Sequence, residues 1–512
     1  MTQPIRIQSP PGIERDGTVL DSNAYTDARW CRFQRGLPKK MGGYAVVNEV
    51  ADQRVYGMST FSASGVNFVH MGTGSFFRQT QLDSNGNFIG AFDRTPLLGF
   101  NSDPQNMWQM AVLAESTGAT TAEARILAHA APNLDITSEI EREIWIGAVG
   151  GVAPMVDSTL TPVSGGIVAV GPYLVSFGNA GQVVWTAPNV PTANPIANYA
   201  WITPQKIVRG MELRGSGSGP SALLWSLDSL VRMTFANDPS IDWRFDTISS
   251  DISILSSQGV IEYDGIYYWA GVDRFLSFNG VVREMPNDMN QNWFFDNLNY
   301  AQRQKVFVFK VTRYGEIWWC YPRGNATECT HAVIFNVRYG IWYDTELPAD
   351  GRTAGIYAKV FNRPLMVNAV PELVTGLYKL WQHEIGLNAI DGANQSAIES
   401  YFESKDISFL KAGEGGQAVD KSTLIERVEP DFNQSGQMSL IIKGQANSRS
   451  PEISSDPFLF EDNAVIPTAE TLKLREIRRF LRFRFESHTL NGDYEMGYAI
   501  AHIGPADGRI ES

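Results

Sequence analysis

The residue types that most often bind metals or act as nucleophiles are scattered through this 512-residue sequence. The three cysteines, Cys31, Cys320 and Cys329, are odd in number and form no Cys-x-x-Cys pair, so they indicate neither a disulfide framework nor a zinc knuckle. The histidines show no His-Glu-x-x-His motif and no pair at metal-ligand spacing. They are His70, His129, His331, His383, His488 and His502. The sequence therefore predicts no metal, no cofactor and a reducing compartment.

Motifs for nucleotide binding and hydrolysis are also missing. The glycine-rich GSGSGP at 215–220 lacks the Lys-Ser/Thr of a phosphate loop and precedes a strand-like run, so we expect a mobile loop. No Gly-x-Ser-x-Gly elbow is present, and Cys31 has no partner signature. Glycosidases use paired carboxylates, but 55 acidic residues produce such pairs by coincidence. The Ser-x-Asp-x-Gly-x-x-Trp boxes of sialidase-like propellers are absent, and the nearest approach, SDPQNMW at 102–108, lacks the glycine. We therefore expect no enzyme and no catalytic residues.

The charge balance is acidic, with 42 Lys and Arg against 55 Asp and Glu and a formal net charge of −13. This balance disfavours a protein that reads DNA sequence, because phosphate contacts need a cationic surface. The densest basic cluster consists of Lys473, Arg475, Arg478, Arg479, Arg482 and Arg484, interrupted by Glu476 and Glu486. Two interpretations stay open: a strip that faces phosphate or another subunit, or the solvated face of an edge strand, where charges discourage aggregation.

The sequence predicts a mainly β fold. Short runs of aromatic and β-branched residues, bounded by turn residues, recur from about residue 50 to 385. Four dipeptides that tolerate the positive φ of tight hairpins separate apolar runs. They are Asn85-Gly86, Asp264-Gly265, Asn279-Gly280 and Asn491-Gly492.

Tryptophan marks an internal repeat. Trp145, Trp185, Trp225, Trp269 and Trp318 follow one another in steps of 40, 40, 44 and 49 residues, each late in a β-like run. A repeat of this length with about four strands is typical of a β-propeller blade. We therefore predict a β-propeller in which these five residues occupy equivalent positions, packed between neighbouring sheets.

Two local patterns fit this fold. Residues 286–303 are expected to form an inserted helix, with Asn287 or Asp288 available as its cap. KVFVFKV at 305–311 places valines on one face and phenylalanines on the other, as expected for a strand covered on both sides.

The composition divides the chain into an extended N-terminal arm (1–45), the β-propeller (46–385) and a C-terminal β domain (386–512) that begins in a polar stretch. Four to six strands in this last part suggest a small β-sandwich-like domain. One of them alternates Leu481, Phe483 and Phe485 on a packed face with Arg482 and Arg484 on a solvated face.

The arm has too few apolar residues for its own core, yet Trp30, Phe33 and Tyr44 would be costly to leave in water. We expect it to pack on the rest of the chain or on a neighbouring subunit. The candidate contacts with another subunit or an adaptor are Lys473, Arg475, Arg478, Arg482, Arg484, Trp30 and Phe33.

The N-terminus lacks the apolar core of a signal peptide, and the longest nearly apolar run, 167–177, is too short to span a bilayer. We expect a soluble protein without a membrane-spanning segment or a visible export signal.

Several segments resemble the propeller of short-tailed bacteriophage (podovirus) tail hub proteins, also called nozzle or packaged-DNA stabilisation proteins. They are the run EYDGIYYWAGVDRFLSFNGVVREM, the inserted helix and the later segments VFVFKV, EIWWCYP and AVIFNVRYGIWYD. Segments near both ends of the chain resemble the same family. They are the N-terminal WCRFQRGLPKKMGGY, RVEPDF at 427–432, RRFLRFRFES, GDYEMG at 492–497 and the terminal Asp507-Gly508-Arg509.

The resemblance implies a structural protein of the phage tail, made in the host bacterial cytoplasm. Such hubs form a homo-hexameric ring beneath the portal and adaptor, retain packaged DNA and form part of its ejection channel. The implied partners are the head-to-tail adaptor ring, tail fibre or needle proteins and double-stranded DNA that passes without sequence recognition, with no small-molecule substrate. An acidic or neutral wall suits this role, since a channel that bound phosphate would impede DNA exit.

Two alternatives stay open. One is a phage receptor-binding or glycan-degrading propeller at the tail periphery, similar to a tailspike. The other is a cellular propeller scaffold.

Overall fold

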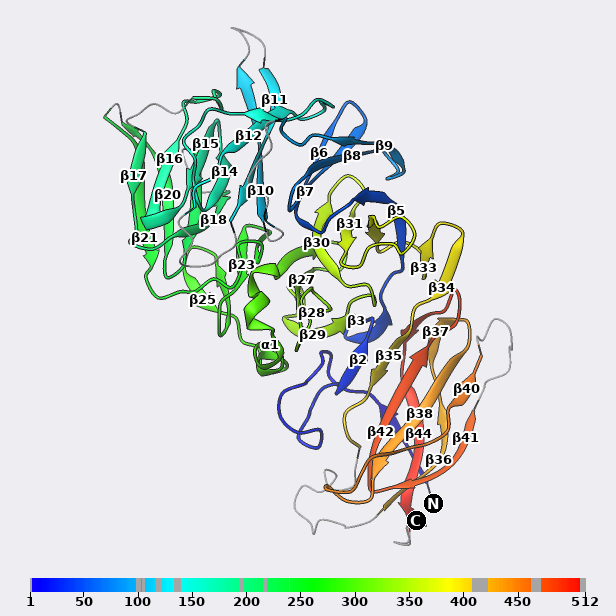
Figure 1. Ribbon diagram of the computed structural model, residues 1–512. Helices are drawn as coiled ribbons and strands as arrows, with labels where there is room; N and C mark the ends of the chain where they lie inside the picture. Colours follow the sequence, from blue (N-terminus) through cyan, green and yellow to red (C-terminus); the bar gives the residue numbers. More distant parts are fainter. Residues whose placement is uncertain are drawn as a thin grey trace.

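The computed structural model describes residues 2–97, 103, 106–116, 122–132, 140–193, 198–214, 219–238, 240–407, 422–461 and 471–506. Its strands form ten sheets; six of these are built from successive strands of the chain, and a seventh combines β30 to β34 (residues 352–397) with β5 (residues 44–51). The innermost strands of most neighbouring sheets contact one another, the fourth and fifth sheets share one apolar cluster, and the seventh sheet contacts the first. The seven sheets are therefore the blades of a β-propeller (Figure 1).

Each of the first six blades is an antiparallel meander of four strands. Blade 1 comprises β6 (Val55–Ala63), β7 (Val66–Thr73), β8 (Phe77–Leu82) and β9 (Phe88–Asp93). Blade 2 comprises β10 (Met107–Ser116), β11 (Ala122–Ala131), β12 (Ile144–Ala148) and β13 (Val156–Asp157). Blade 3 comprises β14 (Gly166–Val170), β15 (Tyr173–Phe177), β16 (Gln182–Trp185) and β17 (Tyr199–Trp201), with the short helix η1 (Asn179–Gly181) before β16. Blade 4 comprises β18 (Ile207–Glu212), β19 (Ser221–Ser226), β20 (Leu230–Asp238) and β21 (Ile241–Ser249). Blade 5 comprises β22 (Val260–Tyr263), β23 (Ile266–Ala270), β24 (Phe275–Phe278) and β25 (Val282–Glu284). Blade 6 comprises β26 (Phe307–Val311), β27 (Glu316–Tyr321), β28 (His331–Asn336) and β29 (Ile341–Glu346).

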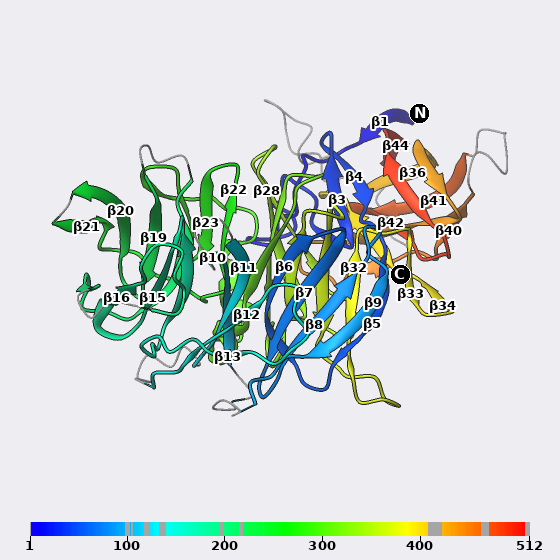
Figure 2. The same ribbon diagram turned by 90° about the horizontal axis from the view of Figure 1, so that it is seen from above.

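The seventh blade joins two distant parts of the chain. Its strands β30 (Arg352–Ala358), β31 (Arg363–Asn368) and β32 (Tyr378–His383) are completed by β5 (Tyr44–Ala51), which pairs antiparallel with β32. The ring is thus closed by hydrogen bonds between its first and last strands, and residue 46, where the propeller was expected to begin, lies inside β5. The hairpin β33 (Asn388–Asp391) and β34 (Asn394–Ala397) extends this sheet beyond β5 (Figure 2).

The five tryptophans fall one each in blades 2 to 6, and none is more than 7% exposed. Their expected equivalence is wrong. Trp145 and Trp185 lie in third strands, whereas Trp225, Trp269 and Trp318 lie in second strands. Trp225 and Trp269 also meet across one interface, with ring centroids 5.7 Å apart, so they project from opposite faces of their blades. An interface can be filled from either blade, and regular spacing therefore does not ensure the same position.

Three of the four expected hairpins are present, at Asn85-Gly86, Asp264-Gly265 and Asn279-Gly280. The fourth expectation is wrong, because Asn491-Gly492 joins strands of different sheets. The strand at 305–311 is covered on both sides as predicted: Val306 packs toward blade 5, whereas Phe307 and Phe309 belong to a second cluster on the opposite face.

The insert contains a helix, but it is shorter than the predicted 286–303: α1 spans Gln291–Asn297 and is followed by η2 (Tyr300–Lys305). Its cap differs from the prediction. The Asp16 carboxylate, from the arm, accepts hydrogen bonds from the backbone N–H groups of Asn292 (2.9 Å) and Trp293 (2.7 Å). Asn287 instead accepts from residues of the preceding turn, and Asp288 is exposed.

Replacing Asp16 with alanine is expected to lower the free energy of unfolding by about 1 kcal/mol, the usual cost of losing a capping side chain. The matched control is Asp288→Ala, which removes the exposed carboxylate first expected to cap this helix. Chemical denaturation of both variants checks the assignment. Equal losses in the two variants would contradict it.

The N-terminal segment is an integral part of the C-terminal β domain. Its strands β1 (Gln3–Ile7), β2 (Asp27–Arg29), β3 (Cys31–Gln34) and β4 (Leu37–Lys40) enter all three sheets of that domain (Figures 1 and 2). The other strands are β35 (Ser400–Glu403), β36 (Ser422–Glu429), β37 (Phe432–Ser435), β38 (Met438–Gln445), β39 (Ile453–Ser454), β40 (Phe458–Phe460), β41 (Leu472–Arg478), β42 (Phe480–Ser487), β43 (Asp493–Met496) and β44 (Ala499–Ala506). The domain therefore has more strands than the expected four to six.

The GSGSGP loop lies outside the described residues at 215–218, as do most of SDPQNMW before Asn106 and the terminal Asp507-Gly508-Arg509. Among the described residues, none of the helices has the length and hydropathy needed to cross a bilayer.

Candidate functional site

The predicted basic strip is divided between two sheets. Lys473 and Arg475 are exposed on β41, which pairs with β36. On the same strand Arg478 forms an ion pair with Glu476 at 2.9 Å. Arg482 and Arg484 lie on β42, between β35 and β38. The residues therefore form no continuous surface, and of the five candidates Lys473 and Arg475 remain exposed.

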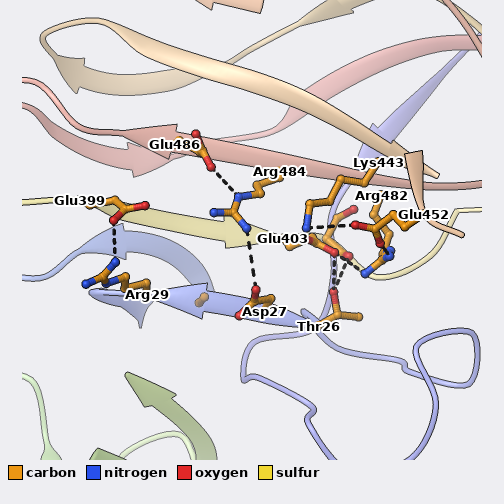
Figure 3. Close-up of polar contacts among 12 residues, drawn as sticks. Thr26, Asp27, Arg29, Glu399, Glu403, Lys443, Glu452, Arg482, Arg484 and Glu486 are labelled. Atoms are coloured by element: carbon orange, nitrogen blue, oxygen red, sulfur yellow. Dashed lines mark hydrogen bonds and ion pairs between the residues drawn. The ribbon is translucent and has the colours of Figure 1, made fainter. Parts of the chain in front are cut away.

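Arg482 belongs to a compact group of two cations and two carboxylates (Figure 3). Its guanidinium forms ion pairs with Glu403, which is 1% exposed, and with Glu452. Lys443 Nζ lies 2.8 Å from Glu403 Oε2 and 3.3 Å from Glu452 Oε1. The face of β42 expected to be solvated is therefore covered, because β35 supplies the carboxylate that neutralises it.

Arg484 connects the C-terminal domain to the arm. Its Nε lies 2.5 Å from Glu486 Oε1, and its Nη1 lies 3.9 Å from Asp27 Oδ2 (Figure 3). The guanidinium also stacks 3.6 Å from the ring centre of Tyr401. Planar stacking together with carboxylate contacts is typical of arginine.

The arm continues this series of ion pairs to the propeller. Arg15 Nη1 lies 2.6 Å from Asp27 Oδ1, and Arg15 Nε lies 3.1 Å from Asp344 Oδ1 on β29. Burial raises the pKa of Asp344, and Arg15 opposes that shift. The charged groups thus run from blade 6 through the arm to β42. We call the residues Arg15, Asp27, Asp344, Arg484 and Glu486 the junction network.

A second, more deeply buried contact holds the arm against the propeller. Arg32, 1% exposed, lies 3.0 Å from Glu316 Oε1 of β27 through its Nε and also pairs with Glu384. Its guanidinium stacks 3.8 Å from the ring centre of Tyr314. Burial raises the pKa of Glu316, while the charge of Arg32 lowers it.

The two aromatic candidates of the arm are enclosed within the chain. Trp30 is 5% exposed, donates its indole N–H to Gly42 O and packs against Trp318. Phe33 is 2% exposed and packs edge-to-face against Tyr343. In this structure neither side chain is presented to another subunit, because the propeller and the C-terminal domain already cover both.

Sequence reasoning missed the carboxylates that organise these contacts. Glu316 in EIWWCY and Asp344 in IWYDTE are each the one buried acid of a strand whose neighbouring residues are buried. A buried charge needs a partner. An acidic residue within an apolar strand therefore indicates a buried ion pair. The sequence does not show which cationic residue is its partner.

We expect buried histidines to make the stability of the protein depend on acid pH. Burial lowers the pKa of His129 to about 4, and its Nε2 contacts Val163 O at 3.0 Å. As the pH falls below about 6.5, the unfolded chain takes up a proton that the folded site rejects, so stability present above that pH is lost. This residue alone should contribute a loss of about 1.5 kcal/mol between pH 6.5 and 5.

Chemical denaturation across this range checks the prediction. His129→Leu should lower stability at pH 7.5 but flatten the acid dependence relative to the unmodified protein. His488→Gln is the control, because His488 is exposed. If both variants retained the original slope, His129 would not be responsible.

Other reactive groups are inaccessible or dispersed. Cys31, Cys320 and Cys329 are free and buried, and burial raises the pKa of Cys31 to about 12. Within the described part of the chain, no group of three or more His, Cys, Asp or Glu side chains is placed to hold a metal ion.

Comparison with known proteins identifies no family. No protein-family model and no curated protein matches the sequence. Among solved structures the chain is similar to the crystal structure of BamB from Moraxella catarrhalis, with 10% sequence identity and a TM-score of 0.35. The match covers 70% of this chain and 97% of that chain. The propeller assignment therefore rests on the sheet order and strand contacts described above.

Proposed function

We propose that this chain is a structural, non-enzymatic subunit of a short-tailed phage tail hub, in which six copies form a ring that retains packaged DNA and forms part of its ejection channel. The sequence resemblance supports this role, since its motifs lie in blades 5 and 6, the arm and the C-terminal domain. A structural observation agrees with it: the arm completes all three sheets of the C-terminal domain and is joined to blade 6 by the junction network.

This arrangement suits a part that carries mechanical load. A ring that holds DNA in a filled capsid is pushed outward by its contents, and its subunits must resist hinge motion between domains. Ordinary interdomain surfaces permit such motion unless they are large and apolar. Here one apolar cluster contains Phe33 of the arm, Trp318 of blade 6 and Phe485 of the C-terminal domain, so the three parts share a core.

The exposed cations of β41 are the proposed contacts with the adaptor ring or a neighbouring subunit. Lys473 and Arg475 are exposed, whereas Arg482 and Arg484 are paired within the chain. Arginine favours bidentate pairing with a partner carboxylate. Tail fibre or needle proteins remain further proposed partners.

The first experiment measures assembly. Native mass spectrometry of the full chain, alone and with the adaptor ring, should show a species of about 340 kDa, six times the chain mass of 56.7 kDa. Lys473→Glu combined with Arg475→Glu should weaken adaptor binding at least tenfold. Arg244→Glu, which changes an arginine with 74% side-chain exposure in blade 4, should not. A monomer under both conditions would contradict the proposal.

The second experiment concerns the channel. Six copies at −13 carry about −78 in total, and we expect an electronegative bore that does not hold duplex DNA. Electrophoretic mobility shift at low salt should show no sub-micromolar binding by the assembled ring. Tight binding that weakens steeply with added salt, or absence of the chain from purified virions, would reject this role.

A further inference from the structure

A cavity of about 250 Å³ opens near the propeller axis, where the innermost strands β10, β14 and β18 meet. Apolar residues such as Val168 and Met211 form part of its wall, and polar atoms line a comparable share of it. The polar groups at the cavity are Arg209, Glu212, Arg214 and Glu262. A cavity in which a few polar groups converge beside apolar residues is a common form of small-molecule site.

Arg209 has no partner among the described residues that line this cavity. Its Nε is buried and its N–H donates to no acceptor, and no ion pair joins its guanidinium to any described residue. Other arginines whose Nε is buried without an acceptor differ in this respect: Arg232 lies 3.2 Å from Asp246, and Arg478 lies 2.9 Å from Glu476. Burial lowers the pKa of Arg209 to about 10, which still leaves it positively charged at neutral pH.

The nearby carboxylates are held by other groups. Glu262 Oε2 lies 3.4 Å from Lys310 Nζ, and its Oε1 accepts the Gly265 N–H at 2.8 Å. Glu212 Oε1 accepts the N–H of Gly171 at 3.2 Å. A partly buried cation without a counter-ion is costly, because a charge removed from water needs compensation.

We propose that Arg209 binds a small oxyanion, the phosphate, sulfate or carboxylate group of a free small molecule, in this cavity. The planar guanidinium offers paired N–H donors that match two oxygens of such a group. This binding activity goes beyond the proposed tail role and does not depend on ring assembly.

Thermal denaturation of the full chain tests the proposal, with inorganic phosphate as the probe and chloride adjusted to constant ionic strength. Phosphate at 10 mM should raise the Tm of the unmodified protein by about 2 to 4 °C. Arg209→Gln should abolish this shift and, without phosphate, should melt at or above the unmodified Tm, since it removes an uncompensated charge. Arg244→Gln, an exposed control in the same blade, should keep the shift.

Sulfate and acetate titrations distinguish the source of the anion, because a phosphate-selective site responds to phosphate alone. Isothermal titration of phosphate into the unmodified protein gives a second readout that does not depend on the variants folding. The absence of heat and of a Tm shift with all three anions would overturn the proposal. An equal phosphate shift in Arg209→Gln would also overturn it, because binding would then lie elsewhere.

Discussion

Replacing Arg32 with methionine is expected to lower the free energy of unfolding by about 3 to 5 kcal/mol, the usual cost of leaving one member of a buried ion pair alone. Glu316 has no exposed side-chain surface, and it would retain only the hydrogen bonds from Tyr343 (2.7 Å) and Trp318 (2.9 Å). Denaturation at pH 7.5, followed by tryptophan fluorescence, measures the loss. The deficit should shrink toward acid pH, because protonation of Glu316 removes the unpaired charge.

Two further variants separate charge from packing. Adding Glu316→Leu to Arg32→Met should restore at least half of the lost stability, because the unpaired carboxylate is then gone. Arg35→Gln is the exposed control: the Arg35 side chain is 72% exposed and pairs with Glu495 at the surface, so we expect a change within about 0.5 kcal/mol. A loss below about 1 kcal/mol for Arg32→Met would show that the arm is not held by this contact.

Replacing Trp269 with alanine is expected to cost about 3 to 5 kcal/mol, as for other large-to-small changes in a core. Trp269 has 0% exposure, donates its indole N–H to Ser253 O at 3.0 Å and packs edge-to-face against Trp225. The variant opens a cavity between blades 4 and 5.

Trp201→Ala is the matched control, because Trp201 lies in β17 with 63% exposure. Its effect should stay below about 1 kcal/mol. Urea denaturation of the two variants compares them directly. Similar losses in both would mean that the interface between blades 4 and 5 contributes little to stability.

Features encoded over a few residues could be predicted from the sequence. Asp264-Gly265 forms the predicted hairpin because both residues adopt positive φ, as a tight turn requires. The strand at 305–311 is apolar on both faces because two blades cover it. The presence of a helix within 286–303 and the propeller class likewise follow from local pattern and repeat length.

The candidate contact residues show where such reasoning stopped. The sequence near Arg482 places it on a solvated strand face, yet its partners Glu403 and Glu452 are 79 and 30 residues away. Trp30 and Phe33 were correctly expected to need cover, but the cover comes from blade 6 and the C-terminal domain of the same chain.

By itself, the sequence determined the β class, the hairpins, the inserted helix and the need of the arm for a partner, because turn geometry and the alternation of apolar residues act between near neighbours. The tertiary structure decided the closure of blade 7 by β5, the division of the basic strip, the cap from Asp16 and the isolation of Arg209. Each of these depends on which distant strands pair and on which charges burial then brings together or leaves apart. No local periodicity records that information, because pairing between distant strands depends on the packing of the whole chain.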